Sequence, residues 1–220
     1  MTDSYTDELF APKSEYMQTV VFPVSRLALD PERFEDDAQE VMAERGMGVI
    51  YARTSDGLLL REAPTENERK ILIERYYKPH HLKLQESVDV CLQSFGRCVI
   101  FDCHSFPSVP LPYEDDQNPD RPDICIGTDE FHTPDALCQI LKEAVARNGL
   151  SCEINRPFSG SIVPGKYYRR NSNVNSIMFE VNRGLYMNEK TGEKGVGFEK
   201  HQKTIGAILE LLRMEYERIE

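Results

Sequence analysis

The sequence predicts an α/β protein in which a mixed, mainly parallel sheet is flanked by helices. Short runs rich in β-branched residues alternate along the chain with longer segments of helical periodicity, as in sheets covered by helices. The run CVIFD (98–102) is apolar up to its last residue, which is typical of a strand buried on both faces. The 220 residues, of which 40% are hydrophobic, are enough to bury a substantial core. Because we find no repeat and no linker, we expect a single domain over residues 1–220.

The expected elements follow from local patterns. Segments with the composition of strands cover residues 19–29 (ending near Arg26), 48–54, 98–102, 123–128, part of 151–161, and 174–187. Three segments have the period of amphipathic helices. The first starts at Ala63, and the other two cover residues 134–149 and 198–219.

Capping and breaking residues set the expected helix ends. In the first helix, Thr65 and Glu68 fit a capping box, and Pro79 should bend or break the helix. The second helix should begin with Thr133 as its cap and Pro134 in its first turn, and it should stop at Gly149.

Charge and composition exclude several classes of function. The formal net charge is −11 at pH 7, which argues against binding to nucleic acid or to an anionic membrane. No apolar run is long enough to cross a bilayer, and the segment MTDSYTDELF lacks the layout of a signal peptide. The six cysteines stand singly, as reduced thiols do. We therefore expect a cytoplasmic protein; the sequence leaves its oligomeric state open.

The run VIFDCHSFPS (99–108) places an acid, a thiol and an imidazole at the end of an expected strand. His104 is either a structural residue or a metal ligand. The second interpretation is favoured because Asp102 and Ser105 could hydrogen-bond to the ring and fix its tautomer, as neighbouring polar groups do for zinc-binding histidines. Cys103 alternates away from His104 on a strand, so we expect it to pack in the core.

Charged residues follow other expected strands. Glu180 lies among apolar residues in SIMFEVNRGLY, so it is either paired with Arg183 or functional as a general base. Arg26 and Arg33, with Arg156 and Arg183 further on, stand beside turn signals, and guanidinium groups suit carboxylate recognition. An anion site is one interpretation of these arginines, and surface salt bridges are the other.

The remaining histidines show no pattern of metal ligands. His80 and His81 are adjacent on a helix and point apart, so they are not expected to bind one metal. His132 and His201 are expected at the surface. Composition and spacing thus favour a metal or acid/base site without naming a substrate.

Five motifs follow one another along nearly the whole chain. They are FPVSRLALDPERFEDD, YYKPHHLKL, IFDCHSFPS, NRPFSGS and FEVNRGLYM. This series resembles that of the N-formylglutamate amidohydrolases, which are similar in fold to zinc carboxypeptidases and aspartoacylases. The resemblance implies a zinc carboxypeptidase-like fold, zinc as cofactor, and hydrolysis of N-formyl-L-glutamate to formate and L-glutamate in histidine degradation. Hydrolysis of another small-molecule N-acyl amino acid by the same machinery is the alternative.

The resemblance also implies roles for individual residues. His104 and Asp3 would be zinc ligands, with Asp3 on the first helix, and Glu180 would be the general base for the attacking water. The residues that would bind substrate carboxylates are Arg26, Arg33 and Arg183.

Two departures from the family pattern bear on these roles. Family members carry a His-Ser-Gly motif upstream of TDSYTD that supplies the first zinc ligand, and this sequence has no counterpart. Either the chain starts at an internal Met, or its metal site is lost or rebuilt, which would leave a catalytically impaired or metal-free member. Glu32 stands where many members have Asn, which could change carboxylate recognition. His81 matches a family position whose role the resemblance leaves open.

Overall fold

The computed structural model describes residues 2–11, 14 and 16–218. These residues form two compact units. Unit 1 contains the described residues of Met1–Thr2, Val20–Ser87 and Pro110–Gln117, and unit 2 contains those of Asp3–Thr19, Val88–Val109 and Asn118–Glu220. The expectation of one domain over residues 1–220 stays a prediction.

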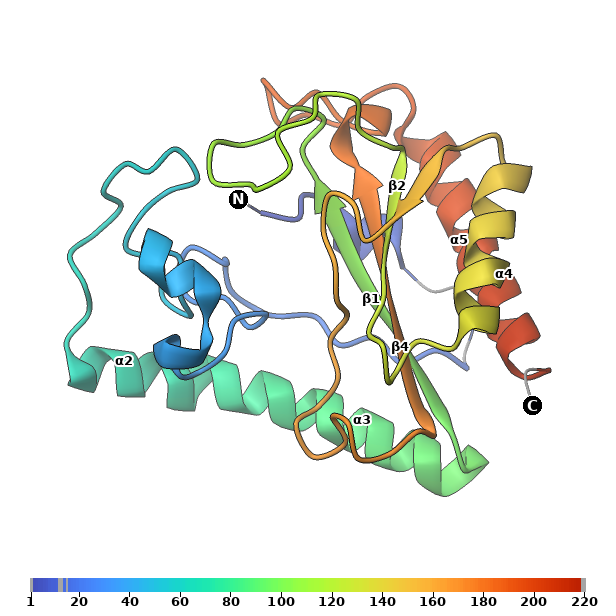
Figure 1. Cartoon of the computed structure of the whole chain (residues 1–220), viewed down its shortest axis with the longest axis horizontal. Coiled ribbons are helices and arrows are strands. Elements are labelled where there is room, and N and C mark those ends of the chain that lie inside the picture. Colours follow the sequence, from blue (N-terminus) through green and yellow to red (C-terminus); the bar gives the residue numbers. More distant parts are fainter. Residues whose placement is uncertain (1, 12–13, 15, 219–220) are drawn as a thin grey trace. The chain divides into compact units, whose positions relative to one another are not determined.

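A four-stranded sheet organises unit 2 (Figure 1). Its strands are β1 (Cys98–Phe106), β2 (Ile124–Gly127), β3 (Cys152–Ile154) and β4 (Val174–Asn182), in the spatial order β1-β4-β2-β3. The pairs β1–β4 and β2–β3 are parallel, whereas β2 and β4 are antiparallel. The predicted mixed, mainly parallel sheet is therefore confirmed, and the strand predicted at 98–102 extends to Phe106.

Helices α4 (Asp135–Arg147) and α5 (Phe198–Tyr216) lie together on one face of this sheet (Figure 1). The short helix α1 (Thr6–Leu9) joins the same core. Residues from the sheet and the helices that meet there include Ile126, Ile177, Phe179, Leu137, Leu141, Ile205 and Leu209. Cys103 packs against this core, as its alternation from His104 predicted.

The opposite face of the sheet is covered by the last turns of α3 (Lys78–Phe95), which belong to unit 2 from Val88 onward. Val88 is buried with Ile100 and Val174 of the sheet, and Leu92 packs against them. Helices thus flank the sheet, as expected for its apolar strands.

Unit 1 has a small core and no sheet among its described residues. Its elements are η1 (Asp37–Gln39), η2 (Val41–Arg45), α2 (Glu66–Leu72), the π-helical turn η3 (Ile73–Tyr77) and the first part of α3. Leu29, Val49, Ile50 and Ile73 form the core.

The strands predicted at 19–29 and 48–54 are wrong. Both segments are irregular, and the single bridge in the second joins Arg53 to Leu59 across the SDG turn. Val49, Ile50 and Tyr51 of the second segment are buried as coil, whereas Val21 of the first is exposed. Neither segment has a neighbouring strand among the described residues that completes a ladder, and Pro23 offers no N–H for one.

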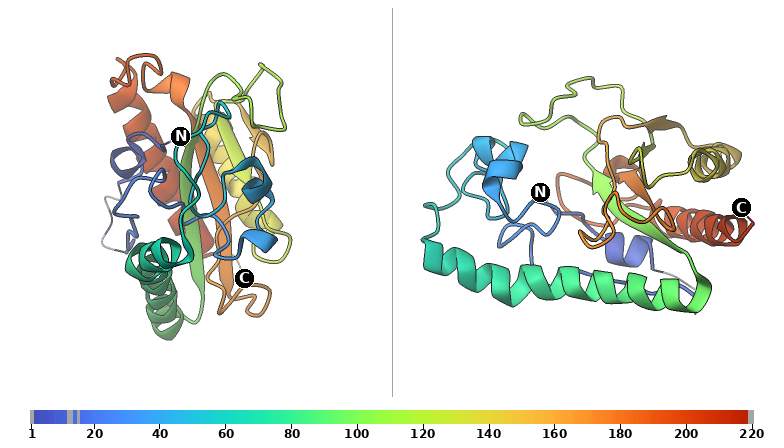
Figure 2. Two further views of the ribbon diagram at one scale, coloured as in Figure 1. Left: turned by 90° about the vertical axis from the view of Figure 1, so that its left-hand side faces the viewer. Right: turned by 60° about the horizontal axis from the view of Figure 1, so that its bottom comes forward.

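One helical rod runs from Glu66 to Phe95 and shows no break at Pro79 (Figure 2). Its start is the predicted capping box, in which Glu68 N donates to Thr65 Oγ1 (3.3 Å) and Thr65 N donates to Glu68 Oε2 (2.9 Å). The predicted break is wrong because a wide π turn precedes the proline, with the N–H of Lys78 donating to the carbonyl of Ile73. Such a turn can accommodate a residue without an N–H.

The other helix ends match the prediction in part. The N-cap of α4 is Pro134, not Thr133, whose Oγ1 donates to the carbonyl of Ser176 (2.6 Å). Gly149 follows the helix with φ +72°, as its predicted stop requires. Helix α5 ends at Tyr216, and residue 219, the predicted end, lies outside the described residues.

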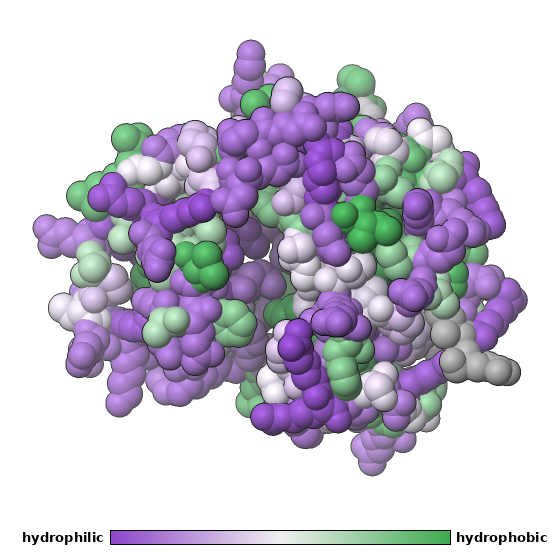
Figure 3. All heavy atoms as spheres, viewed as in Figure 1, coloured by the Kyte–Doolittle hydropathy of each residue, from purple (hydrophilic) through white to green (hydrophobic). Residues whose placement is uncertain are grey.

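Within the described part of the chain, no helix combines the length and the apolar character needed to cross a membrane. Hydrophilic residues predominate on the face seen in Figure 3, where hydrophobic residues occur in small separate groups.

Candidate active site

The candidate site begins at the C-terminal half of β1, where Asp102 and His104 project from one face of the sheet. His104 Nε2 donates to Asp102 Oδ1 (2.7 Å), and the second oxygen of Asp102 accepts from the N–H of Ile162 (2.9 Å). Asp102 is buried, so its two hydrogen bonds offset the loss of hydration. The carboxylate therefore fixes the plane of the His104 ring.

Asp3 approaches the other nitrogen of the same ring. Its Oδ2 is 3.6 Å from His104 Nδ1, and its Oδ1 accepts hydrogen bonds from Ser105 N (3.1 Å) and Ser105 Oγ (3.4 Å). Asp3 precedes α1 instead of lying on it, and its carbonyl accepts from Thr6 Oγ1 (2.9 Å). The predicted position on the first helix is thus wrong by a few residues. The structure brings Asp3 and His104 together, and their roles as zinc ligands stay predictions.

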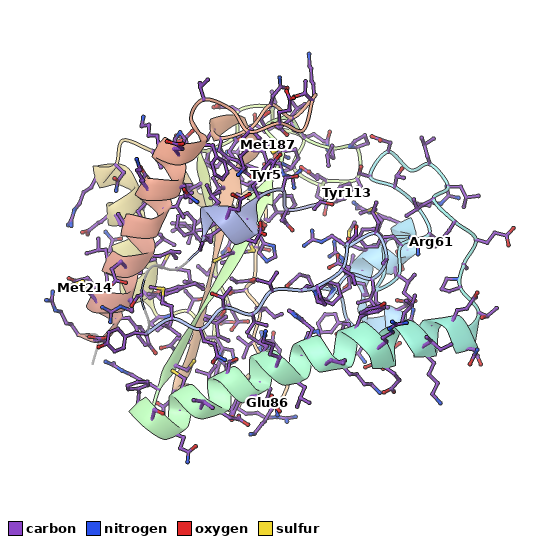
Figure 4. All side chains as sticks on the ribbon, turned by 180° about the vertical axis from the view of Figure 1, so that it is seen from behind. Tyr5, Arg61, Glu86, Tyr113, Met187 and Met214 are labelled. Atoms are coloured by element: carbon purple, nitrogen blue, oxygen red, sulfur yellow. The ribbon has the colours of Figure 1, made fainter. Side chains whose placement is uncertain are left out.

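Arg183 is the first residue of η4 (Arg183–Leu185), directly after β4, and its side chain contacts the same end of the sheet. Its Nε donates to Ser105 Oγ (3.1 Å), its Nη2 donates to Ser105 O (2.8 Å), and Nη2 lies 3.7 Å from Asp3 Oδ1. In Figure 4, Tyr5 and Met187, which follow Asp3 and Arg183 closely in sequence, lie at one end of unit 2. Two distant segments thus meet at the end of β1.

Glu180 stands in the next strand, directly opposite His104 in the parallel register of β1 and β4. On its other side it pairs with Cys125 of β2. Residues at paired positions project from the same face of a sheet, about 5 Å apart. Glu180 is 7% exposed. Burial, with the nearby Glu180 charge, raises the pKa of the Cys125 thiol to about 12, so this thiol stays protonated.

The facing atoms of His104 and Asp3, Nδ1 and Oδ2, are spaced to suit a divalent cation. Two donors at about 2.1 Å from a tetrahedral zinc ion lie about 3.4 Å apart, close to the 3.6 Å between Nδ1 and Oδ2. With Nε2–H donating to Asp102, Nδ1 of a neutral His104 ring and the Asp3 carboxylate oxygen would both be ligands of such a cation. The Asp102 carboxylate on Nε2 supplies the support that zinc-bound imidazoles usually have.

The predicted arginines Arg26 and Arg33 belong to unit 1, where both approach one carboxylate, Asp30. Arg156 instead pairs with Glu153, its neighbour at the end of β3. Sequence reasoning did not single out Asp30. The sequence feature that could have revealed Asp30 is an acidic residue within the apolar run LALDP, where a solvent-exposed position is not expected.

The predictions for His132 and His201 are wrong, because both side chains are buried. The His132 ring hydrogen-bonds to two backbone groups, the carbonyl of Val174 (2.6 Å) and the N–H of Arg169 (2.8 Å). These partners lie far along the sequence, so the local pattern could not reveal them.

The fold and this cluster define a class of α/β protein that places imidazole and carboxylate groups near the ends of adjacent parallel strands. A model of the N-formylglutamate amidohydrolases matches residues 1–187. The chain belongs to this family, as its motifs predicted.

The relatives agree with this assignment. N-formylglutamate deformylase of Pseudomonas putida is 28% identical over 170 residues, which are 75% of this chain and 62% of the relative. The enzyme of the same name from Pseudomonas aeruginosa is 27% identical over 177 residues, 78% of this chain and 65% of the relative. The chain therefore spans less than two thirds of the length of these curated relatives.

Solved structures confirm the fold. N-formylglutamate amidohydrolase from Ralstonia eutropha JMP134 has a TM-score of 0.74 at 23% identity, over 98% of this chain and 83% of that chain. A gene product of Agrobacterium tumefaciens has a TM-score of 0.60 at 19% identity, over 89% of this chain and 68% of that chain.

Proposed function

We propose that the chain hydrolyses the N-formyl amide bond of N-formyl-L-glutamate to formate and L-glutamate. The observation that carries this proposal is the cluster in which His104 is held between Asp102 and Asp3, with Glu180 opposite it. Membership of the N-formylglutamate amidohydrolase family supports the choice of substrate. The six free cysteines support a cytoplasmic location.

His104 Nδ1 and Asp3 Oδ2 would hold a zinc ion, which supplies polarisation of the formyl carbonyl and a water molecule of lowered pKa. Ser105 and Arg183 orient the Asp3 carboxylate, and Asp102 orients the imidazole. A hydrolytic zinc uses roughly three protein ligands, of which His104 and Asp3 would supply two.

Glu180 is the proposed general base. One of its carboxylate oxygens would take a proton from the attacking water and later deliver it to the leaving amine nitrogen. Arg26 and Arg33 are proposed to bind a substrate carboxylate. Arg183 already uses Nε and Nη2 for Ser105 and Asp3, so a substrate carboxylate could approach it only through Nη1.

The test measures formate release from N-formyl-L-glutamate by the chain, first with zinc and then after treatment with a chelator. Glu180→Gln should abolish release while the bound zinc, measured by mass spectrometry, stays at the wild-type level. Glu153→Gln is the matched control, since Glu153 is also a strand glutamate but is exposed and pairs with Arg156. A zinc-loaded chain that releases no formate would refute the proposal, and wild-type rates for Glu180→Gln would refute the role of Glu180.

A second candidate is hydrolysis of another N-acyl amino acid. It is favoured by Glu32, an acid next to Arg33 in sequence. The Arg33 side chain also faces the carboxylates of Asp30 and Glu40. Comparing kcat/KM for N-formyl-L-glutamate, N-formyl-L-glutamine and N-acetyl-L-glutamate separates the two, because a preference for either of the last two would favour this second candidate.

A further inference from the structure

A fully buried carboxylate, Asp30, lies between two arginines in unit 1. Its Oδ2 is 3.5 Å from Nε of Arg26 and 3.5 Å from Nε of Arg33, so the two Nε atoms are no further apart than twice that distance. Asp30 has an exposed fraction of 0%, whereas about a quarter of each arginine side chain is exposed. The negative charge is therefore hidden from solvent, and the positive charges remain accessible.

Hydrogen bonds fix the Asp30 carboxylate itself. The hydroxyl of Tyr51 donates to Oδ2, and the N–H of Glu32 donates to Oδ1 (3.0 Å). Burial and the Asp30 charge raise the pKa of Tyr51, so its hydroxyl keeps the proton that it donates. Since Asp30 N also donates to Val49 O (2.8 Å), the whole residue is held in one position.

The backbone around the arginines is held in the same way. Tyr77 OH donates to the carbonyl of Arg33 (2.9 Å), and His81 Nε2 donates to the carbonyl of Pro31 (2.9 Å). Arg61, labelled in Figure 4, donates to the carbonyl of Leu27. The main chain on both sides of Asp30 is thus fixed, and the Nε of each arginine lies against the Asp30 carboxylate.

Arg33 also contacts a second carboxylate. Its Nη1 lies 3.6 Å from Glu40 Oε1, so the positive charge of Arg33 faces the carboxylates of both Asp30 and Glu40. Attraction of an anion therefore comes from where the guanidinium N–H groups point and not from net charge. The Nε of Arg33 is buried and makes no hydrogen bond to any described residue, so its contact with Asp30 is purely ionic.

We propose that Asp30 is the positioning residue of a carboxylate-binding pair formed by Arg26 and Arg33, a role that rests on the proposed function. Asp30 holds the Nε side of each guanidinium and offsets the repulsion between the two cations. It does not touch substrate. Without its charge the two side chains would move apart and lose the common orientation that binding one carboxylate requires.

Asp30→Asn tests this role, because asparagine keeps the shape and the acceptor for Glu32 N but removes the charge. The KM for N-formyl-L-glutamate should rise about 10- to 50-fold with kcat changed less than about threefold. Asp89→Asn is the matched control, since Asp89 likewise binds a lysine, Lys166 (2.9 Å), and a tyrosine, Tyr167, but lies in unit 2. Its KM should equal that of the wild type, and an equal rise in both variants would overturn the proposal.

A double variant distinguishes positioning from a general structural role. If Asp30 acts through Arg33, Asp30→Asn should raise the KM of an Arg33→Ala chain by much less than it raises that of the wild type. If the increase in KM of the double variant equals the product of the increases of the two single variants, the proposal is overturned. Tyr51→Phe, which leaves the Asp30 charge in place, should raise KM only about two- to fivefold and serves if Asp30→Asn does not fold.

A readout that needs no turnover separates this inference from the proposed function. In a chain with ¹⁵N-labelled arginine, the Nε–H signal of Arg33 should show the order of a rigid group, and Asp30→Asn should make it mobile. An Arg33 signal of unchanged order would overturn the positioning role even if the enzyme is active. If the wild-type chain releases no formate but Asp30→Asn still makes the Arg33 signal mobile, the positioning role is supported and the proposed function is refuted.

Discussion

The buried His132 ring offers a quantitative test of how unit 2 is held together. Its Nε2 accepts from the N–H of Arg169, so Nδ1 carries the proton that goes to the carbonyl of Val174. Arg169 has the left-handed value φ +53°, unusual for a side-chain-bearing residue. The ring therefore joins a strained loop position to the first residue of β4.

His132→Phe keeps a ring of similar size between Phe131 and Tyr168 but removes both nitrogens. Two backbone groups then lose their ring partner in a fully buried place. Each buried polar group without a partner costs about 1–3 kcal/mol. We therefore expect a loss of about 2–6 kcal/mol, which is a large part of the roughly 5–15 kcal/mol that stabilises a typical domain.

The assay is urea unfolding followed by far-UV circular dichroism, with the free energy extrapolated to water. His201→Phe is the control, because His201 is buried on α5 but its ring makes no hydrogen bond to a described residue. It should change stability by less than about 1 kcal/mol. A loss for His132→Phe below about 0.5 kcal/mol, or equal to that of the control, would refute the reasoning.

Three further predictions concern other parts of the chain. Gly127→Ala should cost about 1–3 kcal/mol in urea unfolding, because its Cβ would overlap the carbonyl of Gly160; wild-type stability would contradict this. Interaction with the neighbouring Cys98 thiol lowers the pKa of Cys91, so Cys91 should be alkylated first near neutral pH. Cys98→Ala should slow that reaction roughly tenfold, as peptide mass spectrometry would show. Burial lowers the pKa of His80 to about 4, so the unfolded chain takes up the proton first and stability should fall as pH drops from about 6.5 to about 4. His80→Gln should remove that part of the decline, on the order of 1 kcal/mol after solvent screening, in unfolding measured across this range.

The strands and helices of unit 2 were predictable where local patterns agree with tertiary packing. α5 forms nearly as its amphipathic period predicted, and β4 starts where expected but ends at Asn182, short of the predicted 187. β1 was predicted too short, because Asp102 and His104 look like the end of an apolar strand. In the structure they continue it, since each polar group finds a partner.

Unit 1 shows where such reasoning fails. The segments 19–29 and 48–54 have strand composition, yet a strand exists only beside another strand, and composition does not report a partner. Asp30 and His132 were missed or misplaced for the same reason. Their burial depends on Tyr51 and on Val174, residues that no local window includes.

The candidate site was predicted as residues but not as an arrangement. His104 and Glu180 were each recognised as groups near the ends of strands. That they face each other depends on the register of β1 and β4, which side-chain packing and turns set together. Arg183 was expected to bind substrate or Glu180, and its contacts to Ser105 and Asp3 could not be read from spacing.

The contacts of Asp3 and Ser4 also set a time order for biosynthesis. The carbonyl of Ser4 accepts from the hydroxyl of Tyr186, 182 residues later, and Asp3 meets Arg183. A ribosome that adds about 5–20 residues per second needs roughly 10–40 s to cover that stretch. His104 and Ser105, the other partners of Asp3, are translated well before Arg183. The nascent chain therefore cannot complete the contacts of Arg183 with Asp3 and Ser105 until β4 has been translated.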